Sequence, residues 1–131
     1  MIAIAYTPPA DLDISGTASE LNQVQEMVLE LIRSKRQELR IEADRTFAPT
    51  PYEQSIAALI VRRGTGPTLI SVLDQDVVAV GADHCLEAFA SWFAWPLDAK
   101  FSAHAHYEYF EGNEWIAPKS IPLVIGIRQT E

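Results

Sequence analysis

Two short apolar runs constrain the fold of this chain more than any other feature. Residues 56–61, Ile-Ala-Ala-Leu-Ile-Val, and residues 77–80, Val-Val-Ala-Val, are apolar at every position. Because successive side chains of a β-strand point to opposite faces, such runs predict strands whose two faces both avoid water. We therefore expect a layered fold in which helices, long loops or another copy of the chain cover both sides of a sheet.

Turn and cap signals divide the rest of the chain into strands and two helices. Residues 17–20, Thr-Ala-Ser-Glu, have the spacing of a capping box, and apolar residues then recur at helical spacing to about Ser34. Asp83 is a candidate N-cap for a second helix over residues 84–95, which Pro96 ends. The predicted strands cover residues 2–6, 39–43, 56–61, 68–73, 77–80, 102–110 and 121–128.

The order of these elements predicts the fold class. Short turns at residues 64–67 and 74–76 favour an antiparallel meander of the three strands between residues 56 and 80. We expect residues 1–131 to form a single α+β domain, an antiparallel sheet of six or seven strands with two helices packed on it. Two helices cover one face, so a homodimer is the preferred cover for the other, although long loops, a partner protein or strong coiling of the sheet would also serve.

Charge and cysteine content exclude several classes of function. The chain has 18 acidic and 10 basic side chains, a net charge of −8 that disfavours binding to nucleic acid. The same acidity favours fast association with a basic partner, or simply keeps a small protein soluble. No apolar run is long enough to span a membrane, no basic leader precedes Pro8, and Cys85 has no second cysteine to pair with. We expect a cytoplasmic protein without a cofactor.

The sharpest chemical signal is the row His104, His106 and Glu108. Residues two apart on a strand share a face, so these side chains could ligate one metal ion, and the alternative function is a small metal-binding or metal-dependent enzyme domain. A polar strand face is the simpler interpretation. Cys85 follows His84 at a helix start, where adjacent side chains diverge, so we expect Cys85 to be buried beneath the second helix. The sequence contains no recognisable catalytic motif, and we expect no catalytic residues.

Residues 104–125 combine aromatic and acidic side chains with a loop that contains Gly, Asn and Pro. Tyrosine and tryptophan anchors beside charges are typical of protein interfaces. An alternative is that Trp115 folds back against the sheet edge and Pro118 only shapes the loop. The predicted partner-binding residues are Glu108, Tyr109, Glu111, Asn113, Glu114 and Trp115.

The same stretch resembles the C-terminal signature of the immunity protein 32 family. In that signature a His-containing strand runs into Glu-Tyr, then a Gly-bearing loop, Ala-Pro-x-Ser, and Pro-Leu followed by aliphatic residues. The matching positions are His106, Glu108, Tyr109, Gly112, Ala117, Pro118, Ser120, Pro122 and Leu123. The resemblance covers about 22 of 131 residues. It implies a small cytoplasmic bacterial protein that binds and neutralises a polymorphic toxin, and it carries no catalytic residues over to this chain.

Overall fold

The first predicted helix is present almost as the sequence pattern indicates. The computed structural model describes residues 1–128, and helix α1 spans Ala18–Arg33. Thr17 Oγ1 accepts a hydrogen bond from the N–H of Glu20 (3.1 Å), and Glu20 Oε1 accepts one from the N–H of Thr17 (2.8 Å). The predicted capping box is therefore confirmed, and it pairs two of the backbone donors that a helix start leaves free.

The second helix is shorter than predicted. Helix α2 spans Asp83–Ser91 rather than residues 84–95. Asn22 of α1 donates to the carbonyl oxygen of Trp95 (2.9 Å) and accepts from its N–H (2.9 Å), which holds this backbone outside the helix. The prediction that Asp83 is the N-cap is wrong, because Ala82 occupies that position without a side-chain hydrogen bond. The Asp83 carboxylate lies in the first turn and binds the Arg63 guanidinium through both oxygens, at 2.9 and 2.8 Å.

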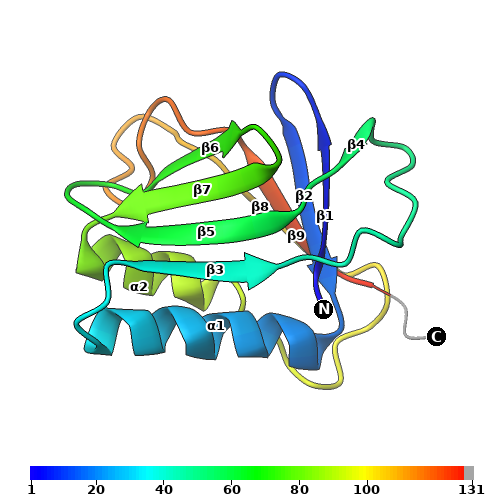
Figure 1. Cartoon of the computed structure of the whole chain (residues 1–131), viewed down its shortest axis with the longest axis horizontal. Helices are drawn as coiled ribbons and strands as arrows, with labels where there is room; N and C mark the ends of the chain where they lie inside the picture. The colour runs from blue at the N-terminus through cyan, green and yellow to red at the C-terminus, as the bar shows by residue number, and fades with distance from the viewer. Residues whose placement is uncertain (129–131) are drawn as a thin grey trace.

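The strands form two mixed sheets, so the prediction of one antiparallel sheet of six or seven strands is wrong (Figure 1). The five-stranded sheet has the order β4-β1-β2-β9-β8, with bounds Gln54–Ser55, Ala3–Thr7, Asp11–Gly16, Leu123–Ile127 and His104–Tyr107. The four-stranded sheet has the order β3-β5-β7-β6, with bounds Glu38–Glu42, Ala58–Arg63, Asp76–Gly81 and Leu69–Leu73. Each sheet contains one parallel pair, β2 with β9 and β5 with β7.

The predicted meander is also wrong. Strand β5 lies beside β7 and parallel to it, in a register that pairs Leu59 with Val77, and β6 lies on the outer side of β7. Burial explains this order, because β7 is apolar at four successive positions and gains most from a central place. Strand β6 occupies an edge position, where Leu69 and Leu73 remain 38% and 57% exposed.

Strand β2 was not predicted, and it completes a hairpin with β1 across Pro8 and Pro9. Leu12 and Ile14 on β2 point into the core, whereas the intervening Asp13 is only partly buried. The strand predicted over residues 102–110 is shortened to β8. Its start is delayed because Ser102 adopts a φ of 73°, which is incompatible with a strand.

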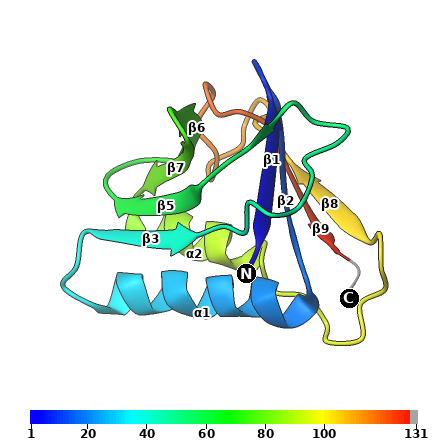
Figure 2. The same cartoon turned by 45° about the vertical axis from the view of Figure 1, so that its right-hand side comes forward.

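Both helices lie together on one side of the molecule and contact the two sheets (Figures 1 and 2). Helix α1 packs against β2 and β3, which belong to different sheets, and α2 packs against α1 and β7. One buried cluster contains residues of both sheets and both helices, including Ile14, Leu21, Leu59, Phe89 and Ile125. Within residues 1–128, neither helix has the length and apolar character needed to cross a membrane.

Part of the outward face of the four-stranded sheet is sheltered within one chain, although Leu69 and Leu73 on its edge strand β6 stay exposed. Ala58 and Val78 point outward but are only 0% and 4% exposed. Arg40 reaches across β5 to Asp76 on β7 (3.3 Å between Nη1 and Oδ2), and its aliphatic stem therefore covers apolar surface. A second copy of the chain is therefore not needed to cover Ala58 and Val78. The homodimer stays a prediction.

Candidate functional site

Strand β8 and the residue that follows it present the predicted polar row to solvent. His104, His106 and Glu108 are exposed, whereas Ala105 and Tyr107 between them are partly buried. The expectation that these three polar side chains share an outward face is therefore confirmed. The imidazole rings of His104 and His106 lie edge to face with their centres 5.2 Å apart.

A groove separates helix α2 from the end of β8 and the segment that follows it. We call it the aromatic groove, and it has a volume of about 420 Å³. It is lined by Ala88, Ser91, Trp92, His106, Tyr107, Glu108, Phe110, Asn113, Trp115 and Ile116. The indole of Trp92 stacks on the Tyr107 ring at 4.4 Å and 12°, which fixes the wall between α2 and β8. Burial between these elements raises the pKa of Tyr107.

Large apolar side chains remain exposed at this groove. Phe110 and Trp115 are 65% and 45% exposed. The Trp115 indole meets the His84 imidazole of α2 edge to face, with ring centres 6.1 Å apart. Solvent-exposed rings held by a rigid framework are the usual anchors of protein interfaces.

The six predicted partner-binding residues occupy different positions around this groove. Glu108, Asn113 and Trp115 line it, while Glu111 and Glu114 are exposed in the same segment without lining it. Tyr109 is partly buried and does not line the groove. The Asn113 side chain shapes the loop itself, because its Oδ1 accepts from the N–H of Trp115 (2.8 Å) and of Ile116 (3.1 Å).

The backbone of this segment closes the free edge of strand β6. The N–H of Thr68 donates to the carbonyl of Trp115 (2.8 Å), and the N–H of Ile121 donates to the carbonyl of Ile70 (2.9 Å). Between them, Ser120 Oγ accepts from the N–H of Ile70 (3.0 Å) and donates to the carbonyl of Thr68 (3.1 Å). The backbone of Trp115 therefore covers the sheet edge, as the alternative interpretation expects, while its indole stays accessible and its role in partner binding stays a prediction.

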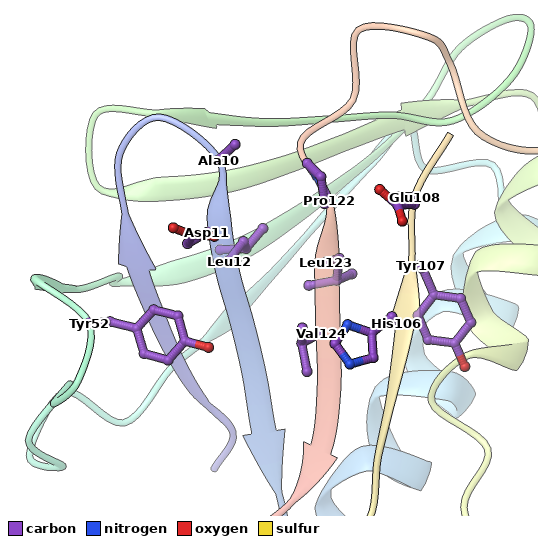
Figure 3. Close-up of a pocket in the computed structure, with 10 residues that line it drawn as sticks. All are labelled: Ala10, Asp11, Leu12, Tyr52, His106, Tyr107, Glu108, Pro122, Leu123 and Val124. Carbon is purple, nitrogen blue, oxygen red and sulfur yellow. The ribbon is translucent and has the colours of Figure 1, made fainter. Parts of the chain in front are cut away.

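A second hollow lies on the other side of β8, over the outward face of the five-stranded sheet (Figure 3). It has a volume of about 330 Å³, and Tyr52 and Asp11 face His106 and Glu108 across strand β9. His106 and Glu108 therefore form a ridge between this hollow and the aromatic groove. We call it the Tyr52 hollow.

Other predicted chemistry finds little support in the geometry. Within residues 1–128, no three His, Cys, Asp or Glu side chains are grouped closely enough to hold a metal ion. Cys85 is buried (1% exposed), as predicted, although it is part of α2 rather than beneath it, and its Sγ donates to the carbonyl oxygen of Glu114 (3.8 Å). Burial raises the pKa of the Cys85 thiol, which disfavours the nucleophilic thiolate.

Several residues of these surfaces were not predicted. Trp92 and Phe110 line the aromatic groove, and Asp11 and Tyr52 line the Tyr52 hollow. The alternation of polar and apolar residues over 11–16 is a signal that could have identified β2 and its outward carboxylates. Tyr52 lies in a loop, and no periodic signal indicates where its ring points.

Comparison with known proteins identifies no relative: no family model, no curated protein and no solved structure matches this chain.

Proposed function

We propose that this chain is a bacterial immunity-type protein, without enzymatic activity, that binds and neutralises a cognate protein toxin. The observation that carries the proposal is the aromatic groove, in which exposed Phe110 and Trp115 stand beside a rigid Trp92–Tyr107 wall. The residues that contribute most to binding between proteins are enriched in tryptophan, tyrosine and arginine and lie in well-packed pockets. The resemblance of residues 104–125 to the immunity protein 32 signature supports the same function.

The charge around the groove specifies the chemistry of the partner surface. Residues 101–118 contain Glu108, Glu111 and Glu114 and no lysine or arginine. An acidic rim around an apolar groove fits a basic protein surface that inserts an apolar side chain. The glutamates then act mainly on the association rate and its dependence on salt, while the aromatic residues limit dissociation.

The test uses the protein encoded by the reading frame next to this one. That protein is purified as a catalytically inactive variant, and its affinity for this chain is measured by calorimetry. We expect Trp115→Ala to weaken binding by about 2 kcal/mol, roughly 30-fold. Phe101→Ala is the matched control, since Phe101 is also an exposed aromatic residue (61%) but lies outside the groove.

Two results would contradict this proposal. Either the neighbouring protein does not bind, and co-expression of this chain does not protect cells from its active form, or Trp115→Ala and Phe101→Ala bind it equally well. The second result would leave toxin binding intact but remove the groove as its site.

A second candidate is metal binding by His104, His106 and Glu108, whose side chains are exposed at alternate positions along β8 and the residue that follows it. A third ligand would have to come from a rearrangement, because Glu108 and these histidines are not grouped as a metal site in the described residues. Metal analysis of the purified protein, with His106→Ala as the control, decides the question. Stoichiometric zinc or iron that is lost in the variant would favour this candidate over the toxin-binding proposal.

A further inference from the structure

Strand β8 is the last strand of the five-stranded sheet, and one of its two edges has no neighbouring strand (Figure 2). Strand β9 pairs antiparallel with the other edge. The N–H of Ile127 donates to the carbonyl of Ala103 (2.8 Å), so the backbone groups of Ala103 and, by alternation, of Ala105 face β9. The backbone N–H and C=O groups of His104 and His106 therefore point away from the sheet.

These edge groups have no partner in the part of the chain that the structure describes. No hydrogen bond there involves the backbone N–H or C=O of His104 or His106. The edge of strand β6 differs, because the segment after the aromatic groove closes it with backbone hydrogen bonds. Strand β3 is also an edge strand, but its exposed side chains are all charged (Glu38, Arg40 and Glu42), which discourages pairing with another chain. The free edge of β8 is thus the one to which an extended segment can add.

The aromatic groove lies beside this free edge. It is lined by His106 and Tyr107 of β8, and by the aromatic side chains of Trp92, Phe110 and Trp115. An added strand would alternate its side chains between the two faces of the sheet. On the face towards α2, where Tyr107 stacks on Trp92, every second side chain of that strand enters the aromatic groove. Those side chains must be apolar to contact the exposed rings.

The other face of the added strand meets acidic groups. It lies beside the row of His104, His106 and Glu108, and Asp11 faces this row across β9 in the Tyr52 hollow. Residues 101–118 supply no lysine or arginine to neutralise these carboxylates. Opposite charges on neighbouring strands attract each other, so basic side chains are favoured on this face of the added strand.

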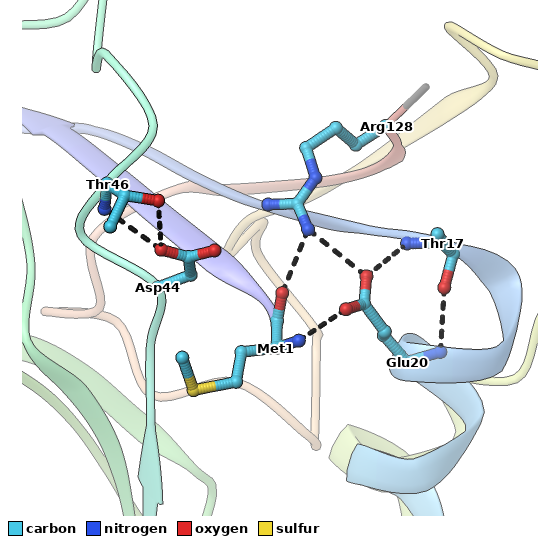
Figure 4. Close-up of polar contacts among 6 residues, drawn as sticks. All are labelled: Met1, Thr17, Glu20, Asp44, Thr46 and Arg128. Carbon is cyan, nitrogen blue, oxygen red and sulfur yellow. Dashed lines mark hydrogen bonds and ion pairs between the residues drawn. The ribbon is translucent and has the colours of Figure 1, made fainter. Parts of the chain in front are cut away.

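Strand β8 is supported by a strand that is fixed to the rest of the molecule. Strand β9 lies between β2 and β8, and just beyond its end the N–H of Arg128 donates to the carbonyl of Gly16 on β2 (2.8 Å). Arg128 Nη2 donates to the carbonyl of Met1 (2.9 Å) and to Glu20 Oε1 (3.2 Å), which ties the end of β9 to the start of α1 (Figure 4). An edge that is already ordered loses little conformational entropy when a segment binds to it.

We propose that the partner protein adds a β-strand of alternating basic and apolar residues to the free edge of β8. Its backbone pairs with His104 and His106, its apolar side chains fill the aromatic groove, and its basic side chains meet Glu108. This inference rests on the proposed toxin-binding function, and it specifies the kind of toxin segment that the chain recognises.

The test uses the inactive neighbouring protein described above and two substitutions at one position. His106→Pro removes the N–H that faces the free edge, and an edge strand tolerates proline where that N–H makes no bond to its neighbour. His106→Ala is the matched control, because it removes the same side chain and keeps the N–H. We expect His106→Pro to bind at least about tenfold more weakly than His106→Ala. Urea unfolding of both variants establishes that both remain folded.

Hydrogen exchange of the unsubstituted ¹⁵N-labelled chain gives a second measurement, which needs no variant. The amides of His104 and His106 should exchange at least about tenfold more slowly in the complex than in the free chain. The amides of Ala105 and Tyr107 already face β9 and should change much less. Docking through side chains alone does not produce this alternation along one strand.

Equal binding by His106→Pro and His106→Ala, or unchanged exchange at His104 and His106 in the complex, would overturn the strand addition and leave toxin binding intact. A free chain that is dimeric and that His106→Pro makes monomeric would also overturn it, because a second copy would then occupy the edge.

A neighbouring protein that does not bind refutes the proposed function, and a peptide then tests the edge. The probe is acetyl-Lys-Val-Arg-Phe-Lys-Val-Arg-amide, and its control is the isomer acetyl-Lys-Arg-Lys-Arg-Val-Phe-Val-amide, which lacks the alternation. The alternating peptide should shift the amide signals of His104 and His106 to saturation and bind more tightly than its isomer. Equal binding of the two peptides, or no binding of either, overturns the proposal.

Discussion

Removal of one hydroxyl group tests the account of how the edge of strand β6 is closed. In Ser120→Ala, the N–H of Ile70 loses its acceptor and the carbonyl of Thr68 loses one of its donors. Ile70 is 1% exposed, so water does not easily replace the lost partner of its N–H. A hydrogen bond contributes about 1 kcal/mol net, and an unpaired buried donor costs about 1–3 kcal/mol. Because the second case applies here, we expect the free energy of unfolding to fall by about 1–3 kcal/mol.

The measurement is urea unfolding of the variant and the parent chain, with hydrogen exchange of individual amides as a local probe. For a chain of this length, the expected loss lowers Tm on the order of 10 °C. The amide of Ile70 should exchange faster than in the parent chain, and that of Thr68 should change less because its bond to the Trp115 carbonyl remains. Ser71→Ala is the matched control, since Ser71 lies on the same strand and its side chain makes no hydrogen bond in the described structure.

Equal stability of Ser120→Ala and Ser71→Ala, within about 0.5 kcal/mol, would refute this reasoning. Unchanged exchange at Ile70 would refute it independently, because it would mean that another group protects this amide. A normal stability combined with aggregation would instead indicate that the hydroxyl matters mainly in keeping other chains from pairing with the edge.

Three further predictions concern stability and reactivity. Burial raises the pKa of Asp13, so its ionised carboxylate destabilises the fold at pH 7. Asp13→Asn should therefore raise the midpoint of urea unfolding at pH 7. The increase should vanish below about pH 3.8, where the carboxyl group is protonated in both the folded and the unfolded chain. Asn22→Ala removes both hydrogen bonds to the Trp95 backbone and should cost about 1–3 kcal/mol in the same assay, whereas Asn22→Asp, which keeps an acceptor, should still protect the Trp95 amide from exchange. Cys85, buried and with a raised pKa, should react with iodoacetamide only at the rate of unfolding, and modification of the native protein within minutes at pH 8 would contradict its burial.

The elements that the sequence predicts well are those whose signals are local. The capping box and the apolar spacing of residues 21–32 lie within one helix, and the alternation at residues 39–43 lies within one strand. The pairing of strands is not predicted by local signals. Strand β5 pairs with β7 rather than with β6, which follows it in sequence, and β2 pairs with β9. Short turns bias neighbouring strands towards hairpins, but burial of a fully apolar strand outweighs that bias.

The same distinction between local and long-range signals applies to the surface residues. The outward row of His104, His106 and Glu108 could be predicted because alternation fixes the face of a strand. The residues that face this row could not be predicted in the same way, because Tyr52 lies in a loop, where no alternation fixes the direction of a side chain. The sequence does not decide the role of Trp115 for a physical reason, since a residue whose backbone carbonyl accepts a hydrogen bond from a sheet edge can still expose its side chain.

The parallel pairing of β2 with β9 determines when the fold can be completed during synthesis. Leu12 and Leu123 are partners in this ladder, so the closing contact joins residues more than a hundred positions apart. Such distant contacts slow folding, because chain entropy is lost before the contact stabilises anything. While the chain emerges from the ribosome, residues 38–81 can already assemble the four-stranded sheet, but the β1–β2 hairpin waits with an open edge until β9 is translated. The time between synthesis and a functional molecule is then governed by the last strand, and chaperone dependence should be concentrated in that interval.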